Sequence, residues 1–183
     1  MRKIVNPLPG MALGPKKIIS IVSLLIIGGA LWATPAVDGA VGQGEYPYAI
    51  KVLDGSVTIS YAPDRQGGLY LAVSAAATGW VGLGLGSHVM DGAYIFMGYV
   101  RDGQAVFSEQ QGSGHRHAAS PEHRADQSAV GLQGGVTTIE FHIPADKLPF
   151  ADKNCNFIVA YADAADLSTF HEDNETGGTI KLP

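Results

Sequence analysis

The most constraining feature of this sequence is a strand-like run in which glycine alternates with larger apolar residues. The run covers residues 80–86, WVGLGLG, and the tight loop 87–92 separates it from a second apolar run at residues 93–100. A strand with glycine at every second position has one face without side chains, so another group can approach its backbone closely. That group is another sheet, an aromatic side chain or a flat ligand ring.

Short alternating runs recur along the chain at spacings of about 8–12 residues, with turn signals such as Asp54-Gly55 and Gly134-Gly135 between them. This pattern predicts an all-β fold, an antiparallel β-sandwich of about nine or ten strands. Residues 112–126 are polar and predict an irregular loop, and Val136, Thr138 and Phe141 or Ile143 are expected to face the core. The expected strands are residues 49–53, 57–61, 69–76, 80–86, 93–100, 105–111, 128–133, 136–143, 156–162 and 179–182.

Residues 1–42 differ in composition from the rest, and we interpret them as a targeting segment. Lys16 and Lys17 precede an apolar run at residues 18–32, which small residues follow. The run holds about 15 residues, whereas a spanning helix needs about 20. A secretory signal cleaved after Ala36 is therefore favoured, and an uncleaved membrane anchor is the alternative. Both interpretations predict an exported, extracytoplasmic domain.

The domain that follows, residues 43–183, is acidic. It carries eight Lys and Arg residues against sixteen Asp and Glu residues, a formal balance of −8. Nucleic-acid binding depends on basic clusters, so a nucleic-acid partner is not expected. Cys155 is the only cysteine, which excludes an intrachain disulfide and a CxxCH haem-attachment motif. No motif of a hydrolase, metalloprotease or nucleotide-binding enzyme is present, so we do not expect an enzyme.

Four stretches resemble the core of DOMON domains. They are GWVGLGLG, the loop MDGA that begins at Met90, the strand and turn YIFMGYVRDG, and the late segment IVAYADAADLSTFH, which ends at His171. The resemblance extends over about residues 46–182. It implies an immunoglobulin-like β-sandwich outside the cytoplasm. Many such domains bind haem b, others are proposed to bind sugars, and several serve redox enzymes or membrane b-type cytochromes.

The resemblance also implies a cofactor site. Met90 and His171 match the axial haem ligands of the cytochrome domain of cellobiose dehydrogenase, which is similar in these motifs. A non-covalent haem b is then expected, in a slot formed by Trp80, Gly82, Gly84, Tyr94 and Phe96. A haem with both axial positions filled favours electron transfer with a redox partner protein, for example a membrane b-type cytochrome.

Several alternatives stay open from the sequence alone. His88 is a second candidate ligand, and Met97 fits either the slot wall or the core. A domain without haem that binds a carbohydrate would use the aromatic side chains of Trp80, Tyr94 and Tyr99.

The polar loop at residues 112–126 offers a third candidate site. His115, His117 and His123 could hold Cu²⁺ or Zn²⁺, since imidazole suits both ions. In the same loop, Arg116 and Arg124 are candidate donors to haem carboxylates.

Overall fold

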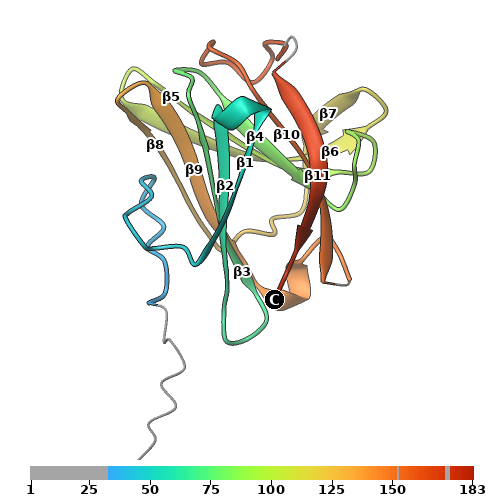
Figure 1. Cartoon of the computed structure of the whole chain (residues 1–183). Helices are drawn as coiled ribbons and strands as arrows, with labels where there is room; N and C mark the ends of the chain where they lie inside the picture. Colours follow the sequence, from blue (N-terminus) through green and yellow to red (C-terminus); the bar gives the residue numbers. More distant parts are fainter. Residues whose placement is uncertain (1–32, 152, 172–173) are drawn as a thin grey trace, which may run out of the picture. The chain divides into compact units, whose positions relative to one another are not determined.

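A computed structural model of the chain describes residues 33–151, 153–171 and 174–183. These residues form two antiparallel β-sheets that pack face to face (Figure 1). The five-stranded sheet has the order β1-β2-β3-β9-β8, and the six-stranded sheet has the order β11-β10-β4-β5-β6-β7. The predicted all-β sandwich is thus confirmed. Of the proposed targeting segment at residues 1–42, residues 1–32 lie outside the described residues.

The strands follow the expected runs closely. The five-stranded sheet consists of β1 (Tyr48–Val52), β2 (Val57–Pro63), β3 (Leu69–Ala75), β8 (Gln127–Gln133) and β9 (Val136–Ile143). The six-stranded sheet consists of β4 (Val81–Leu85), β5 (Tyr94–Arg101), β6 (Gln104–Ser113), β7 (Arg116–Ala119), β10 (Asn154–Tyr161) and β11 (Glu175–Lys181). Two short 3-10 turns, η1 (Leu53–Gly55) and η2 (Ala145–Lys147), complete the elements. Among the described residues, no helix is long and apolar enough to cross a membrane.

The main core lies between the two sheets and is built from alternate residues of each strand. In β4 the inward residues are Val81, Leu83 and Leu85, all fully buried. Phe96 of β5 stacks on Phe141 of β9 with ring centroids 4.2 Å apart, so the two sheets meet through aromatic contact. The remaining residues of each strand point to the outer faces of the two sheets.

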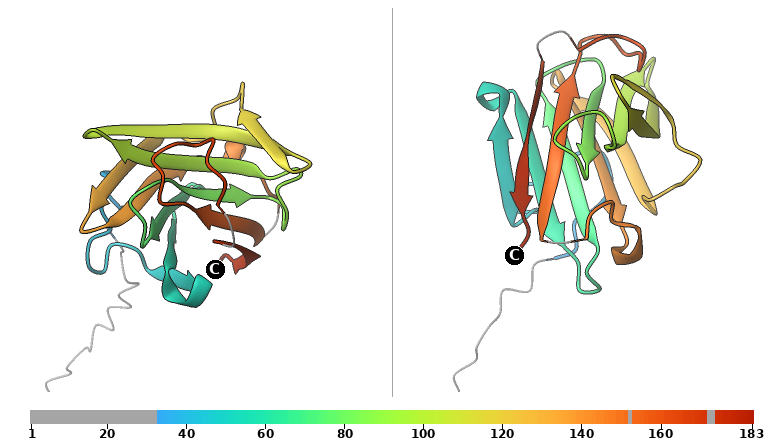
Figure 2. Two further views of the ribbon diagram at one scale, coloured as in Figure 1. Left: turned by 90° about the horizontal axis from the view of Figure 1, so that it is seen from above. Right: turned by 90° about the vertical axis from the view of Figure 1, so that its right-hand side faces the viewer.

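The outer face of the six-stranded sheet is also apolar. A second buried cluster there contains Trp80, Ala93, Ile95, Met97 and Ala162. An antiparallel sheet usually presents one face to the core and one to water. Here the loops that follow β4 and β10 lie over the outer face, on the side turned toward the viewer in the right-hand view of Figure 2. The sheet therefore carries apolar residues on both faces.

Two expectations about individual segments were wrong. The polar stretch 112–126 is not entirely irregular, because β6 continues to Ser113 and β7 pairs with it as a hairpin. In β9 the inward residues are Ile139, Phe141 and Ile143, whereas Val136 and Thr138 point to the outer face. Val136 is 36% exposed, since it begins the strand beside the Gly134-Gly135 turn.

The outer face of the five-stranded sheet carries a buried carboxylate, Glu140 of β9, which is fully buried. Its oxygens accept hydrogen bonds from the backbone N–H groups of Asp38, Gly39 and Ala40 at 3.0, 2.7 and 3.1 Å, and from the Tyr46 hydroxyl at 2.9 Å. Burial raises the pKa of Glu140, although these hydrogen bonds oppose the shift. The carboxylate thereby fastens the segment before β1 onto the sheet.

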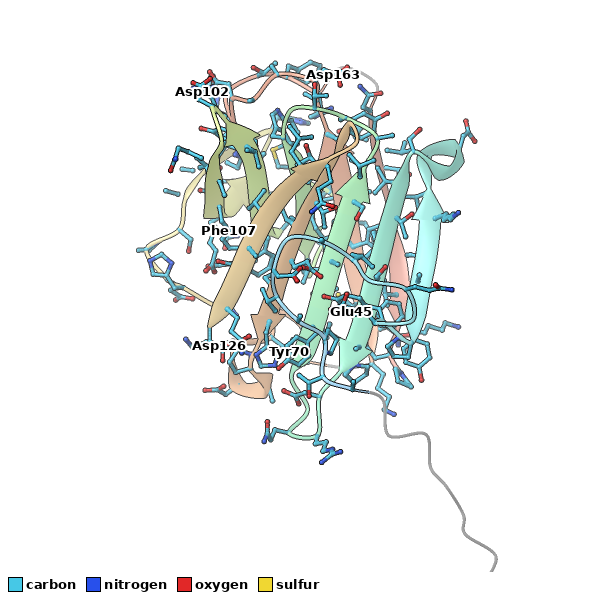
Figure 3. The ribbon with its side chains drawn as sticks, turned by 90° about the vertical axis from the view of Figure 1, so that its left-hand side faces the viewer. Glu45, Tyr70, Asp102, Phe107, Asp126 and Asp163 are labelled. Carbon is cyan, nitrogen blue, oxygen red and sulfur yellow. The ribbon has the colours of Figure 1, made fainter. Side chains whose placement is uncertain are left out.

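A second polar cluster closes one end of the sandwich. The buried His142 of β9 lies between two carboxylates: its Nδ1 is 2.7 Å from Asp126 and its Nε2 is 2.8 Å from Asp64. The ring of Tyr70 packs on the imidazole with centroids 4.2 Å apart. Figure 3 shows Tyr70 and Asp126 together at this end and Asp102 and Asp163 at the opposite end.

Candidate functional site

A cavity of about 480 Å³ lies on the outer face of the six-stranded sheet. Sites for small molecules and cofactors usually measure roughly 300–1,000 Å³. Strands β4, β5 and β10 supply its floor, and the β4–β5 loop, the β6–β7 hairpin and the β10–β11 loop supply its rim. The lining residues are Trp80, Gly82, Gly84, His88, Val89, Met90, Ile95, Met97, His115, His117, Ile158, Val159, Ala160, Phe170, His171, Glu175, Thr176 and Gly177.

Gly82 and Gly84 form part of the floor because their neighbours in β4 point into the core. A Cβ on Gly82 would lie 3.1 Å from Cγ of Met97, and one on Gly84 would lie 2.7 Å from Cγ1 of Ile158. The bare face of β4 is therefore partly covered by side chains from the two adjacent strands. The result is a shallow apolar floor rather than open backbone.

Met90 lies in the loop between β4 and β5, which several contacts fix on the sheet. The Ser87 hydroxyl donates to the carbonyl oxygen of Asp91 at 2.9 Å, and the Asp91 carboxylate accepts from the N–H of Gly114 at 2.7 Å. The carbonyl of Met90 approaches Gly112 of β6 so closely that a Cβ there would collide with it. Gly112 thus determines how near the Met90 loop comes to β6.

His171 lies in the loop between β10 and β11, which is anchored by Trp80. The indole Nε1 of Trp80 donates to the carbonyl oxygen of Thr169 at 3.2 Å, and its backbone N–H donates to Ala164 at 3.2 Å. The Trp80 and His171 rings meet edge to face with centroids 6.4 Å apart. The Nε2 of His171 lies 3.1 Å from a carboxylate oxygen of Glu175.

The structure brings Met90 and His171 to one cavity, although they lie far apart in the sequence. Trp80, Gly82 and Gly84 line the same cavity, and so do the alternative ligand His88 and Met97. Met97 is only 2% exposed, but it belongs to the outer apolar cluster and not to the core between the sheets.

Tyr94 and Phe96 lie elsewhere. Both point into the core between the sheets, because their neighbours Ile95 and Met97 take the outer face of β5. The Tyr94 hydroxyl donates to Glu109 at 2.7 Å, and burial raises the pKa of Tyr94 to about 12. Neither side chain lines the cavity. Of the three aromatic residues expected to stack on a sugar, Trp80, Tyr94 and Tyr99, only Trp80 lines the cavity.

The three histidines of the polar loop are separated. His115 and His117 line the cavity, whereas the Nδ1 of His123 lies 3.6 Å from Glu109. His117 is hydrogen-bonded to Gln110, the neighbour of Glu109 on β6. Adjacent residues of a strand point to opposite faces, so His117 and His123 lie on different sides of the sheet. Within the described ranges, no group of three or more His, Cys, Asp or Glu side chains is arranged to hold a metal ion.

The two arginines of the polar loop also lie away from the cavity lining. The guanidinium of Arg124 packs over the Tyr94 ring at 4.7 Å and donates to the carbonyl of Lys147 at 2.9 Å. Arg116 is exposed at the start of β7. Arg124 is therefore engaged elsewhere, and Arg116 is not part of the cavity lining.

Several residues that line the cavity were not predicted from the sequence. Ile95 and Ile158 come from strands whose other residues fill the core, and Val89 and Phe170 stand at the rim with exposures of 60% and 70%. Alternation within β5 and β10 would have identified the floor residues once the inward face was known. The cavity is thus largely apolar, with the thioether of Met90 and the imidazoles of several histidines in its lining.

Two solved structures with a similar architecture are cytochrome domains. The cytochrome b domain of pyranose dehydrogenase from Coprinopsis cinerea superposes with a TM-score of 0.57 and 12% identity, covering 73% of this chain and 80% of that chain. The cytochrome domain of Myriococcum thermophilum cellobiose dehydrogenase gives a TM-score of 0.51 and 9% identity, covering 74% and 81%. At these identities the similarity shows a shared fold.

Comparisons at the sequence level give no further assignment. No protein family matches this chain, and no curated protein matches it.

Proposed function

We propose that this chain is an exported DOMON-type domain that binds haem b without a covalent link and transfers electrons to or from a redox partner protein. The supporting observation is that Met90 and His171 line one apolar cavity in a fold shared with cytochrome b domains. The bound haem would supply a centre that accepts and releases one electron at a time.

The residues of the cavity fit such a group. Haem is flat and largely apolar, and Trp80, Ile95 and Ile158 provide apolar surface for it. The thioether of Met90 and the imidazole of His171 are both established types of axial ligand, and a Met/His pair raises the reduction potential relative to His alone. Cys155 is buried in the core, in keeping with a non-covalent haem.

Glu175 lies beside one ring nitrogen of His171. A carboxylate orients a ligating imidazole only through the nitrogen that does not bind the metal. Ligation through Nε2 requires the Glu175 carboxylate to turn away from that atom. The Glu175 side chain is 61% exposed, which leaves it room to do so.

The partner is proposed to be a protein with a basic docking surface, for example a membrane b-type cytochrome. The acidic balance of residues 43–183 would attract such a partner and accelerate association, an effect that salt weakens. With two axial ligands from the protein, the iron offers no open position to a substrate. The domain would therefore be an electron carrier rather than an enzyme.

The test is reconstitution of the full chain with haem b, followed by absorption spectroscopy of the oxidised and reduced forms. We expect one haem per chain with a low-spin spectrum. His171→Ala should convert the iron to a high-spin form, and Met90→Ala should lower the midpoint potential. Failure of the unaltered protein to bind haem, or spectra that neither substitution changes, would overturn the proposal.

A further inference from the structure

The cavity holds a second imidazole that is partly shielded from water, the side chain of His117. Four histidines line the cavity: His88, His115, His117 and His171. His88 and His115 are exposed, whereas His117 is half-buried and His171 is buried. His117 and His171 are therefore the two imidazoles that a ligand in the cavity would meet away from bulk water.

The tautomer of His117 is fixed by its neighbour in the sheet. Its Nδ1 is hydrogen-bonded to the amide oxygen Oε1 of Gln110, whose side chain is buried on β6. An amide oxygen only accepts hydrogen bonds, so Nδ1 carries the proton and Nε2 keeps its lone pair. In the part of the chain that the structure describes, no residue makes a hydrogen bond to that Nε2. Ligating histidines characteristically have one ring nitrogen held in this way.

His117 also stands beside Met90. In the β6–β7 hairpin His117 pairs with Gly112, and Gly112 is the residue that the carbonyl of Met90 contacts. The N–H of Gly92 donates to the Gly112 carbonyl at 3.3 Å, which ties the Met90 loop to this same residue. His171 precedes β11, at the opposite edge of the sheet from β7. His117 and the Met90 loop thus lie toward one edge of the sheet, whereas His171 lies toward the other.

We propose that His117 is an alternative axial ligand of the haem iron, which binds opposite His171 in the ferric state and yields to Met90 in the ferrous state. This inference rests on the proposed function. A thioether is a softer ligand than an imidazole and favours the reduced metal. By thermodynamic reciprocity, reduction of the iron then favours replacement of His117 by Met90 as its ligand. The replacement needs no reactant besides the electron.

The experiment uses the full chain reconstituted with haem b, its ferric and ferrous spectra, electron paramagnetic resonance of the ferric form, and a redox titration. The unaltered ferric protein should lack the far-red charge-transfer band of thioether-ligated iron and should show the resonance of iron with two imidazoles. His117→Phe should gain the far-red band and raise the midpoint potential. Met90→Leu should keep the ferric spectrum and lower the midpoint potential.

Two further variants separate ligation from a general disturbance of the cavity. His123→Phe alters an exposed histidine that does not line the cavity and should leave spectra and potential unchanged. Gln110→Glu keeps the acceptor for Nδ1 and makes His117 more basic, so the midpoint potential should fall. This variant tests the proposal even if His117→Phe does not fold.

The outcomes distinguish the two proposals. A far-red thioether band in the unaltered ferric protein, unchanged by His117→Phe, overturns the role of His117 and leaves the haem function standing. A midpoint potential that Gln110→Glu does not lower likewise overturns it. A protein that binds no haem overturns both proposals.

Discussion

The indole nitrogen of Trp80 donates a hydrogen bond to the carbonyl oxygen of Thr169, two residues before His171. Trp80 is 3% exposed and also exchanges backbone hydrogen bonds with the start of that loop. One buried side chain therefore positions the segment that carries His171. A Cβ at the preceding residue, Gly79, would collide with the carbonyl of Ala162, so the Gly-Trp pair is suited to this close approach.

Trp80→Phe should weaken haem binding by about 3- to 10-fold. The phenyl ring keeps most of the apolar contact but cannot donate to Thr169, and a net hydrogen bond is worth about 0.5–1.5 kcal/mol. A looser loop should also leave part of the haem in a high-spin state. Haem titration followed by absorbance measures both effects. Tyr99→Phe, which removes a hydroxyl from the rim of the same outer cluster, is the control, and equal losses in both variants would contradict the role of Trp80.

Gly112→Ala should displace the Met90 loop. The added methyl group would overlap the carbonyl of Met90, and such overpacking costs about 1–3 kcal/mol in unfolding free energy. Because the thioether moves with its loop, the midpoint potential of the reconstituted protein should fall. Ser113→Ala changes an exposed neighbour and should alter neither quantity. An unchanged potential in Gly112→Ala would mean that Met90 does not bind the ferrous iron.

Glu140→Ala should destabilise the domain by about 3 kcal/mol or more. It would leave three backbone N–H groups and the Tyr46 hydroxyl without their shared acceptor in a buried position. Tyr46→Phe removes only one of these donors and should cost about 1 kcal/mol. Urea unfolding measures both variants, and hydrogen exchange at Gly39 should rise sharply in Glu140→Ala. Similar values for the two variants would show that the backbone bonds contribute little.

Asp64 should make the domain sensitive to acid. Burial alone would raise the pKa of Asp64, but hydrogen bonds from His142, Gly68 and Gln66 outweigh burial and lower it. A carboxyl whose pKa is lower in the folded state stabilises the fold above its unfolded pKa of about 3.9, and that stabilisation is lost as the pH falls through the folded pKa.

Asp64→Asn tests this dependence. The variant should be less stable than the unaltered protein at pH 7 by about 1–2 kcal/mol, and the difference should shrink as the pH falls below about 4. Urea unfolding at several pH values measures it. Asp146→Asn, an exposed carboxylate in η2, is the control. A difference that stays constant with pH would contradict the assignment.

The strands could be predicted from the sequence, because turn residues and alternation determine them. The location of Met90 and His171 at one cavity could also be predicted, because the motif resemblance supplied the pair. Which face of β5 enters the core could not be predicted. Its sequence YIFMGYV is apolar at almost every position, so periodicity alone does not tell whether Phe96 or Met97 enters the core. The structure resolves this through the stacking of Phe96 on Phe141, a contact between residues far apart in the chain.

Strand β7 illustrates a different limit. Its four residues, RHAA, are mostly exposed and carry no alternating apolar pattern, so only pairing with β6 makes them a strand. That pairing places His117 beside Gly112 and separates it from His123. The spacing of the histidines in the sequence therefore suggested a grouping that the backbone does not form.

The two apolar clusters of the six-stranded sheet lie on opposite faces and share no residue. The stack of Phe96 and Phe141 involves no residue of the cavity lining. Substitutions on the outer face can therefore alter what the cavity accepts while the contact that joins the two sheets stays in place.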